Sequence, residues 1–425
     1  MNFLEELEWR GMLHQSIPGI EEQLEKGKVI GYIGFDPTAP SLTIGNFVQL
    51  QLLRLFQLSG HQPIVLMGGA TGRIGDPSGK DEERTLKSYD ELDKNLEHQI
   101  TQVKKFLDFE TGDNKALLVN NYDFYKEMNI LDFLRKVGKT LTINYMTSKE
   151  SVKKRIETGL SFTEFSYQLL QAYDFQCLYD QYNCILQMGG SDQWGNITSG
   201  TEFIRKNTNG KAYAVTTPLL TKADGSKFGK SEKGNLWLDE SLTSPYEFYQ
   251  FWIRASDTDI PKYTRYFTLK SKTEVETLEA TYADQPQKIK EILAEELTIR
   301  VHGKAAYEAA LKVSQLMFKN ADKETLLSLG QQDIVIIANE LQDNTFIVPK
   351  PTLAQGVNIV DLLAEYTQIV SSKSDARRAI KSNAISINKD KISDFELSLS
   401  ADILLYDKYL LIENGKKNKF MVIFE

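Results

Sequence analysis

The chain has 425 residues, of which 41% are hydrophobic and 25% are charged, and its net charge is −8. This length exceeds what one compact core can use, so we expect two or three domains. The sequence contains no apolar run approaching the roughly 20 residues that cross a bilayer, and its acidic N-terminus is unlike a secretory signal. These features favour a cytoplasmic protein without a membrane partner. The negative charge argues against a protein that coats nucleic acid through charge alone, although it leaves room for a local basic groove.

The cysteines and histidines indicate neither a metal site nor a disulfide framework. Cys177 and Cys184 are the two cysteines, and their spacing is not that of a CxxC pair. The four histidines are scattered, without a Cys or His neighbour at ligand spacing. We therefore predict no protein-bound metal.

Short runs of Val, Ile and Leu alternate with amphipathic helical patterns through the first half of the chain. These runs begin at Val29, Pro63, Ala116, Cys184 and Ala212. Strands that alternate with helices predict βαβ units and a parallel sheet, that is, a Rossmann-type α/β domain. Because open parallel sheets bind ligands beyond the carboxyl ends of their strands, we expect a site at the loops after Phe35, Gly69 and Gly190.

The pattern changes after the α/β region and indicates further domains. We predict an α/β catalytic domain at 1–220 with a helical insertion at about 125–180, a loop and connection at 221–243, an α-helical domain at 244–319, a linker at 320–350 and an α+β domain at 351–425. Helix formers replace the strand signal in the helical domain, whereas Gly and Pro punctuate the linker. The last block combines a helix pair with short strands.

The stretch GFDPTAPSLTIGN, from Gly34 to Asn46, joins a predicted strand to a predicted helix. The unpaired N–H groups at a helix start can receive a phosphate. Taken alone, however, the stretch is explained more simply by Asn46 capping the helix that follows.

Two loops rich in glycine or lysine could also carry chemistry. The segment GGATGRIGDPSGK lacks the first glycine of a P-loop and the Ser or Thr that should follow its lysine, so a Walker NTPase is rejected. Asp76 in this segment would suit an amine. The second loop, KADGSKFGKS from Lys222 to Ser231, is called the lysine loop below; it carries three lysines and could close on polyphosphate. Considered alone, it is explained as well by a solvated turn.

A polar stripe lies on the predicted helix SFTEFSYQLLQAYDF. Thr163, Tyr167, Gln171 and Asp174 share one face by helical spacing, away from the apolar residues. Such a stripe is usually a solvated face. This one contains a phenol, an amide and a carboxylate but neither Lys nor Arg, which suits a small polar pocket.

In this order, the motifs YIGFDPTAPSLTIGN, GGATGRIGDPSGK, SYQLLQAYDF, GGSDQWGN and KFGKS resemble those of the bacterial tyrosyl-tRNA synthetases, which are class I aminoacyl-tRNA synthetases. The resemblance runs from about Val29 to Ser231. It continues more weakly to the C-terminus, where SKSDARRAIKSNAISIN resembles an S4-type RNA-binding domain. It implies a tyrosine–tRNA ligase of protein biosynthesis, which forms tyrosyl-adenylate and pyrophosphate from L-tyrosine and ATP. Tyrosine would then pass to the 3′-terminal adenosine of tRNA(Tyr).

The resemblance also implies roles for the residues that match the family's motifs. Tyrosine would lie among Tyr32, Asp76, Tyr167, Gln171, Asp174 and Gln193, with its hydroxyl at Asp174 and Tyr32. ATP would contact Gly34, Asp36, Gly45, Asn46, Gly190, Asp192 and Lys230. The catalytic residues would be Thr38, Thr43, Lys80, Arg84, Lys227, Lys230 and Ser231. The tRNA would contact Lys373, Arg377, Arg378 and Lys381, Mg²⁺ would arrive with ATP, and the protein would be a homodimer.

One motif departs from the family's usual HIGH sequence, which has histidine at both ends. Here TIGN places Thr43 and Asn46 at those positions and keeps Gly45. Thr and Asn can donate hydrogen bonds but cannot become cationic near pH 7. More of the phosphate stabilisation is therefore expected from the lysine loop.

Two other interpretations remain open. A paralogue that has lost aminoacylation could bind structured RNA as a scaffold or splicing cofactor, and the TIGN change is its support. An enzyme that adenylates or transfers tyrosine without tRNA is the other, and the S4-like block counts against it.

Overall fold

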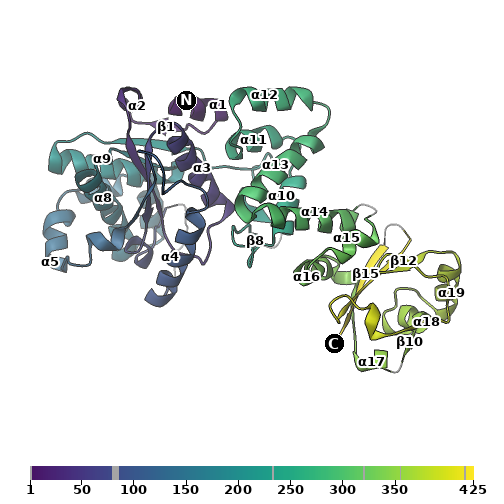
Figure 1. The fold of residues 1–425 in the computed structure, drawn as a ribbon. Coiled ribbons are helices and arrows are strands. Elements are labelled where there is room, and N and C mark those ends of the chain that lie inside the picture. Colours follow the sequence, from purple (N-terminus) through teal and green to yellow (C-terminus); the bar gives the residue numbers. More distant parts are fainter. Residues whose placement is uncertain (1, 79–85, 232–233, 319–320, 355, 416–417) are drawn as a thin grey trace. The chain divides into compact units, whose positions relative to one another are not determined.

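The computed structural model describes residues 2–78, 86–231, 234–318, 321–354, 356–415 and 418–425 (Figure 1). Lys80 and Arg84, which were predicted to meet the phosphates of ATP, lie outside these ranges. The chain divides into two compact units. The first contains residues 1–243 and 253–301, and the second contains 244–252 and 302–425.

A largely parallel sheet forms the centre of the first unit, which confirms the predicted α/β fold. Among the described residues it has six strands in the order β1-β6-β5-β2-β3-β4. The strands are β1 (Gln15–Ser16), β2 (Ile30–Phe35), β3 (Gln62–Met67), β4 (Leu117–Asn120), β5 (Leu186–Gly190) and β6 (Tyr213–Thr217). Strand β1 pairs antiparallel with β6, and the other pairs are parallel. Nearly every residue of β3, β5 and β6 is buried, as expected for strands that are covered on both faces.

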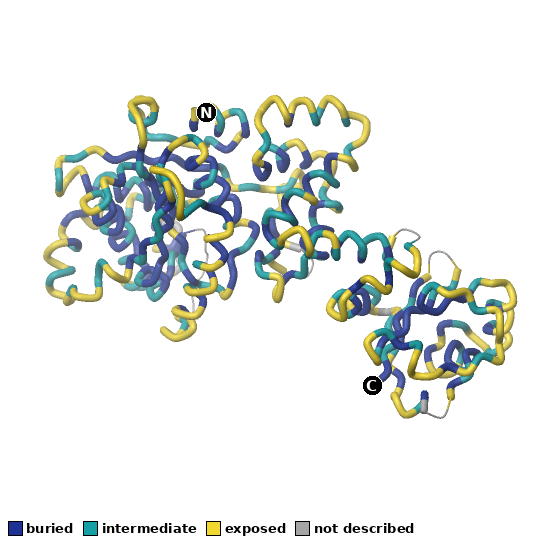
Figure 2. Tube along the Cα trace, in the orientation of Figure 1, coloured by how far each residue is buried: buried dark blue, intermediate teal, exposed yellow. Residues whose placement is uncertain are grey.

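Helices cover both faces of this sheet (Figure 1). Figure 1 shows α8 and α9 on one side of the strands and α3 and α4 on the other. The helices around the sheet are α1 (Phe3–Arg10), α2 (Ile20–Lys26), α3 (Ile44–Leu58), α4 (Tyr89–Val103), α8 (Phe162–Tyr182) and α9 (Trp194–Thr208), with short turns η1 (Thr71–Arg73), η2 (Asn121–Phe124) and η4 (Ser191–Gln193). The core between sheet and helices includes Tyr32, Phe175 and Ile204 (dark blue in Figure 2).

The helical insertion predicted near 125–180 consists of several short helices followed by α8. They are α5 (Ile130–Phe133), η3 (Leu134–Gly138), α6 (Ile143–Thr147) and α7 (Glu150–Thr158). Val137 and Met146 pack with Leu169 of α8 and Phe203 of α9 in a small core of their own. The insertion is therefore anchored to the sheet through α8 and α9.

Beyond the sheet, the first unit contains a hairpin and three helices. The hairpin strands are β7 (Lys230–Ser231) and β8 (Gly234–Asn235), and the helices are α11 (Ile260–Phe267), α12 (Lys272–Thr281) and α13 (Pro286–His302). Arg10 of α1 donates hydrogen bonds to the carbonyl oxygens of Thr268 and Lys270, at 2.9 and 2.8 Å. This buried guanidinium therefore attaches the loop after α11 to the N-terminal helix.

The second unit combines helices with a mixed sheet of order β12-β11-β14-β15-β9. Its helices are α10 (Pro245–Ile253), α14 (Lys304–Phe318), α15 (Lys323–Leu327), α16 (Gln331–Glu340), α17 (Pro351–Ala354), α18 (Ile359–Asp361) and α19 (Lys373–Lys381), with turns η5 (Gln342–Asn344), η6 (Leu362–Tyr366) and η7 (Ala401–Ile403). Its strands are β9 (Thr345–Val348), β10 (Val357–Asn358), β11 (Ile385–Ile387), β12 (Asp390–Lys391), β13 (Ser398–Leu399), β14 (Tyr409–Asn414) and β15 (Asn418–Phe424). A buried core of aliphatic residues between Val348 and Phe424 holds the C-terminal part together.

The segment 320–350, predicted as a linker, contains regular structure. Helices α15 and α16 lie in it, and β9 pairs in parallel with β15 of the C-terminal sheet. Val348 at the end of β9 belongs to the C-terminal core. The division into domains proposed from the sequence stays a prediction, but any cut within β9 would remove a strand from this sheet. In the parts of the chain that the structure describes, no helix combines the length and apolar character needed to cross a membrane.

Candidate active site

A pocket of about 350 Å³ opens at the carboxyl edge of the sheet. Strands β2 and β5 are neighbours, but the chain leaves them in opposite directions across the sheet. Such a switch point leaves a crevice between the loops that follow the two strands. The pocket is lined after β2 by Asp36 and Thr38, after β3 by Gly68, Thr71 and Asp76, after β4 by Asn121, after β5 by Asp192 and Gln193, and from α8 by Tyr167, Gln171 and Asp174.

One end of the pocket is a buried carboxylate. Asp174 of α8 is 1% exposed. Its two oxygens accept hydrogen bonds from Tyr125 Oη at 2.7 Å and from Asn121 Nδ2 at 2.9 Å. Burial raises the pKa of Asp174 to about 7, although both hydrogen bonds act in the opposite direction. Burial therefore favours the protonated form of Asp174 in the ligand-free pocket.

A phenol without a partner lies beside this carboxylate. Tyr32 of β2 is 1% exposed, and its hydroxyl makes no hydrogen bond within the described part of the chain. Burial and the nearby charge of Asp174 both raise the pKa of Tyr32 well above its ordinary value, so this hydroxyl stays protonated. A buried hydroxyl without a partner costs free energy, and a polar ligand group at this end would provide the missing partner.

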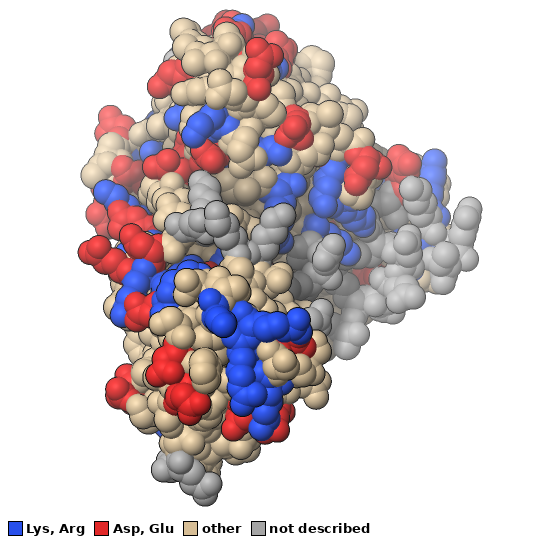
Figure 3. Space-filling model, turned by 90° about the vertical axis from the view of Figure 1, so that its right-hand side faces the viewer, with Lys and Arg blue, Asp and Glu red and all other residues tan. Residues whose placement is uncertain are grey.

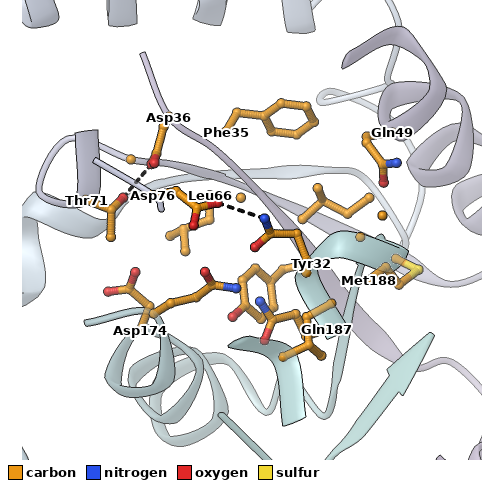
Figure 4. Close-up of a pocket in the computed structure, with 18 of the residues that line it drawn as sticks. Tyr32, Phe35, Asp36, Gln49, Leu66, Thr71, Asp76, Asp174, Gln187 and Met188 are labelled. Carbon is orange, nitrogen blue, oxygen red and sulfur yellow. Dashed lines mark hydrogen bonds between the residues drawn. The ribbon is translucent and has the colours of Figure 1, made fainter. Parts of the chain in front are cut away.

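A network of hydrogen bonds holds the other carboxylates of the wall in place. Asp36 accepts from Thr71 Oγ1 at 2.6 Å and from Tyr167 Oη at 2.8 Å. Asp76 accepts from Gln193 Nε2 at 2.7 Å and from the backbone N–H of Ser78 at 2.9 Å. Figure 4 shows the bond between Thr71 and Asp36 and the bond that ends at Asp76. These bonds fix the orientation of both carboxylates in the wall of the pocket.

The start of α3 corrects the predicted helix cap. Thr43, rather than Asn46, is the N-cap residue, and the helix begins at Ile44. Asn46 Oδ1 accepts from Thr43 N at 2.9 Å and from Thr43 Oγ1 at 2.8 Å, so the two side chains form a reciprocal capping box. Because its oxygen is used in this way, Asn46 has its amide N–H groups left to offer to the pocket that it lines.

The lysine loop approaches the start of α3 closely. Gly229 has a φ of +81°, and a Cβ atom there would lie 2.4 Å from Ile44 Cγ2. Phe228 stacks on Phe267 with ring centroids 5.3 Å apart. Lys227 and Lys230 are exposed and do not line the pocket, and the side chain of Ser231 lies outside the described residues.

Comparison with known proteins decides the family. Residues 24–319 match the family described as tRNA synthetases class I (W and Y), and residues 340–422 match the tyrosine–tRNA ligase SYY-like C-terminal domain. The chain is 51% identical to the tyrosine–tRNA ligase of Cytophaga hutchinsonii, with 100% of this chain and 99% of that protein covered. It is 49% identical to the tyrosine–tRNA ligase of Porphyromonas gingivalis, with both chains covered in full. This chain belongs to the tyrosine–tRNA ligase family of class I synthetases.

A solved structure agrees with the fold of this synthetase. The C-terminally truncated mitochondrial tyrosyl-tRNA synthetase of Aspergillus nidulans is 30% identical and superimposes with a TM-score of 0.66. The match covers 74% of this chain and 94% of the other. Class I synthetases use ATP, so a nucleotide must bind in addition to the amino acid.

The structure of the synthetase brings most of the predicted site residues together. All six residues predicted to contact tyrosine line the pocket, together with Thr38, Gly34, Asp36, Gly45, Asn46, Gly190 and Asp192. Thr43 does not line the pocket; it caps α3 and hydrogen-bonds to Asn46, which does. Thr163 of the polar stripe is not a lining residue either. At Gly190, a Cβ atom would lie 2.5 Å from Asp192 Oδ1, so a larger residue would displace the side chain of Asp192.

Some lining residues of the synthetase were not foreseen from the sequence. Thr71 and Asn121 join the pocket and hydrogen-bond to each other at 2.9 Å, and Gln187 of β5 is also a lining residue. The carboxyl-edge rule could have found Asn121, because it directly follows a predicted strand. Neither spacing nor composition indicated Tyr125, which reaches Asp174 from another element.

The residues predicted to contact tRNA lie on α19 in the second unit. Lys373 Nζ is paired with Asp361 at 2.8 Å and with Glu365 at 2.9 Å, and Arg378 is paired with Asp375. Arg377 and Lys381 are exposed and form no ion pair within the described residues. Figure 3, seen from the side of the C-terminal elements, shows Lys and Arg side chains gathered on one face.

The raised pKa of Asp174 predicts a pH-dependent stability for the ligand-free synthetase. Between pH 4 and pH 7 the folded chain keeps a proton that the unfolded chain has lost, so this contribution to stability declines as pH rises through that window. Asp174→Asn cannot titrate. We expect the stability of the wild type relative to this variant to fall by about 3 kcal/mol between pH 4.5 and pH 8.

Thermal unfolding of both proteins across this range measures the difference. Asp123→Asn, which changes an exposed carboxylate paired with Lys126, is the control and should follow the wild type. A wild-type-to-Asp174→Asn difference that does not vary with pH would show that burial does not hold the proton on Asp174.

Proposed function

We propose that this synthetase activates L-tyrosine with ATP to form tyrosyl-adenylate and pyrophosphate, and then transfers tyrosine to the 3′-terminal adenosine of tRNA(Tyr). The observation that carries the choice of tyrosine is the polar end of the pocket. Asp174 offers an acceptor there, and the hydroxyl of Tyr32 lacks a partner. A phenolic hydroxyl placed between them can donate to the carboxylate and accept from Tyr32, whereas a benzyl side chain can do neither.

The opposite part of the tyrosine site suits an ammonium group. We propose that Asp76, Tyr167 and Gln171 hold it, with Gln193 fixing the carboxylate of Asp76. The backbone N–H of Ser78 and the amide of Gln193 both donate to Asp76, and these two bonds orient its carboxylate. A cation between Asp36 and Asp76 would also relieve the repulsion between these two carboxylates.

The nucleotide is proposed to lie along the carboxyl edge, where glycines leave the backbone accessible. Gly34, Gly45 and Gly190 line the pocket without a side chain, and Asp192 could accept from the ribose hydroxyls. Asp36, Thr38 and Asn46 supply polar groups beside them, while Thr43 orients Asn46. Magnesium is proposed to arrive on the ATP phosphates, and Lys80, Arg84, Lys227, Lys230 and Ser231 to meet those phosphates.

Adenylation requires no general acid or base from the chain. A carboxylate oxygen of tyrosine attacks the α-phosphorus of ATP, and the bond to the pyrophosphate oxygen breaks. The carboxylate is already ionised and pyrophosphate is already a stable anion at neutral pH. The residues therefore act by positioning the reactants and by stabilising the charge that builds on the phosphates.

In the second step, the 2′-hydroxyl of the terminal adenosine is proposed to attack the tyrosyl carbonyl, and AMP leaves. Lys373, Arg377, Arg378 and Lys381 on α19 would contact tRNA phosphates, and the helical segment before them would face the anticodon arm. Such phosphate contacts position an RNA rather than read its sequence. Because Arg377 and Lys381 are exposed without an ion pair in the described residues, they are the two best placed for this contact.

A homodimer in the cytoplasm is the proposed working form. The helical insertion exposes several large apolar side chains, namely Ile130, Leu131, Leu134, Ile143, Ile156 and Phe162. Phe162, at the start of α8, is 75% exposed. Apolar surface of this kind is typical of a face that a second copy covers. Sedimentation equilibrium should find a dimer for the wild type and a shift to monomers for Phe162→Asp; a wild type that is monomeric at micromolar concentration contradicts the proposal.

Tyrosine alone should drive ATP–pyrophosphate exchange when all twenty amino acids are compared. Sites built to hydrogen-bond a hydroxyl reject the analogue without it by about 10⁴–10⁵, a figure for which this enzyme family is itself the reference case. Tyr32→Phe removes one buried oxygen and should reduce the preference for tyrosine over phenylalanine by about tenfold. Exchange driven equally by phenylalanine in the wild type would contradict the proposed substrate. Absence of exchange with any amino acid would favour an RNA scaffold.

The exposed lysines of the loop should act on the rate rather than on amino-acid binding. If Lys227 and Lys230 meet pyrophosphate in the transition state, replacing either by Ala should lower the single-turnover rate of adenylation on the order of 10²-fold. The Kd for tyrosine should stay unchanged. Lys26→Ala, which changes an exposed lysine of α2, is the control. Weaker tyrosine binding with an unchanged rate would show that these lysines do not serve the phosphates.

The free cations of α19 should affect tRNA charging without affecting adenylation. In Arg377→Ala/Lys381→Ala we expect a higher KM for tRNA and a weaker salt dependence of binding, because two phosphate contacts are lost. Pyrophosphate exchange should stay at the wild-type rate. The control is Lys26→Ala/Arg205→Ala, which removes two exposed cations from the first unit. If the two double variants affect tRNA charging equally, α19 does not form a specific contact with tRNA.

A further inference from the structure

Helix α4 carries a row of buried amide side chains that the proposed reaction does not use. Asn95, Gln99 and Gln102 are 5%, 2% and 5% exposed, and their spacing of four and three residues places them on one face. Burial of an amide costs free energy unless its polar atoms are hydrogen-bonded. The hydrogen bonds of these three side chains therefore show which part of the chain they keep in place.

The row binds the backbone of the loop that leads from β2 to α3. Asn95 Nδ2 donates to the carbonyl of Pro37 at 3.1 Å, and Gln99 Nε2 donates to the carbonyl of Ala39 at 2.9 Å. The backbone N–H of Leu42 donates to Gln102 Oε1 at 2.9 Å. Pro37 and Ala39 flank Thr38, which lines the pocket. Leu42 immediately precedes Thr43, the N-cap residue of α3.

Gln102 also reaches the segment that follows the lysine loop. Its Nε2 donates to Ser41 Oγ at 2.9 Å and, at a longer 3.5 Å, to Asp239 Oδ2. Ser41 Oγ in turn donates to the carbonyl of Leu42 at 2.8 Å. Leu238 N donates to that same carbonyl at 2.9 Å. Gln102 thus uses its acceptor and both of its N–H donors at the junction of two segments.

The second of these segments leads directly back to the lysine loop. Ile44 N donates to the carbonyl of Leu236 at 2.9 Å, and Leu236 N donates to the carbonyl of Gly229 at 3.0 Å. Gly229 stands between Lys227 and Lys230 in the loop. A continuous set of buried hydrogen bonds therefore joins Gln102, the start of α3 and the backbone of the lysine loop.

We propose that Gln102 is a positioning residue for the use of ATP: it holds the start of α3 and the base of the lysine loop in a fixed relation on two sides of the nucleotide. This inference rests on the proposed function, because it assumes that both segments meet ATP. The amide touches neither substrate. Its effect passes through the backbone of Leu42 and through Leu236–Leu238, and a displacement of one segment would misalign the groups that stabilise the departing pyrophosphate.

A second buried glutamine separates positioning from simple stability. Gln57, on α3, is also 5% exposed; it makes three hydrogen bonds to backbone groups and accepts a fourth from Arg54 Nη1 at 2.9 Å. Its Nε2 donates to the carbonyls of Asp108 and Asn114 at 2.7 and 3.2 Å, and its Oε1 accepts from Asp108 N at 3.0 Å. These partners belong to the loop before β4, at the amino edge of the sheet, and none lines the pocket. Gln57→Met is therefore a matched control for Gln102→Met.

The experiment compares wild type, Gln102→Met and Gln57→Met in tyrosine-dependent pyrophosphate exchange, with rates normalised to active sites by the adenylate burst. For Gln102→Met we expect kcat/KM for ATP to fall roughly tenfold to a hundredfold, the size of effect that slight misplacement of reacting groups produces. The Kd for tyrosine should stay within about twofold of the wild type. Gln57→Met should lose thermal stability as Gln102→Met does but keep ATP kinetics within about twofold.

Ser41→Ala gives a milder second variant, which keeps the test decisive if Gln102→Met does not fold. It removes the oxygen between Gln102 and the carbonyl of Leu42, and kcat/KM for ATP should fall while tyrosine affinity stays unchanged. Wild-type ATP kinetics in Gln102→Met, or in Ser41→Ala when the former is unfolded, overturn the inference alone. An equal loss in Gln57→Met also overturns it. Absence of exchange in the wild type overturns the proposed function and this inference together.

Discussion

The parallel pairing of β2 with β5 is the constraint on which the rest of the first unit depends. Gly31 pairs with Leu186 and Tyr32 with Gln187, and from this pair the chain builds the sheet outward in both directions. The loops after the two strands must then diverge, which opens the pocket between them. Helix α8 closes its side, because Phe175 packs against Tyr32 with ring centroids 5.2 Å apart. The same packing places Asp174, the residue before Phe175, at the end of the pocket.

The charges of the residues that line this pocket suit the amino acid better than the phosphates of ATP. Four aspartates line the pocket, namely Asp36, Asp76, Asp174 and Asp192, and its described lining contains no Lys, Arg or His. Such a cavity attracts an ammonium group but repels a triphosphate. The cations that we propose to meet the phosphates accordingly lie on segments outside this described lining. The lysine loop is one such segment, and its backbone is tied to the start of α3 through Gly229 and Leu236.

Much of the fold and of the site follows from local pattern. The apolar runs and the intervening helices predicted the parallel sheet, and the carboxyl-edge rule predicted the position of the pocket. The polar stripe of α8 was recognisable because Tyr167, Gln171 and Asp174 keep helical spacing whatever surrounds them. Their grouping with Tyr32 and Asp76 came from resemblance, because those residues lie far apart in the sequence.

The features that the sequence did not predict depend on tertiary contacts. The cap of α3 was misassigned because Thr43 and Asn46 are both good capping residues, and the pairing of residues 42–44 with Leu236 and Leu238 decides where the helix begins. Strand β9 was missed because a four-residue strand gives little signal until β15 lies beside it. The amides of α4 look like solvated residues of an amphipathic helix, and only their partners on the neighbouring loop show that they are buried.

The TIGN sequence and the buried amides of α4 both bear on how the phosphates of ATP would be stabilised. A helix start that offers the neutral amide of Asn46 contributes hydrogen bonds but no full positive charge. Charge stabilisation then falls more heavily on groups carried by loops, whose effect depends steeply on distance in a partly desolvated site. Loops position charges poorly unless a rigid element holds them. In our proposal helix α4 provides that element. Gln102 hydrogen-bonds to Ser41 and Leu42, and the segment 236–238 hydrogen-bonds in turn to Leu42, Ile44 and Gly229. The weaker the charge at the helix start, the more the rate of adenylation should depend on this junction.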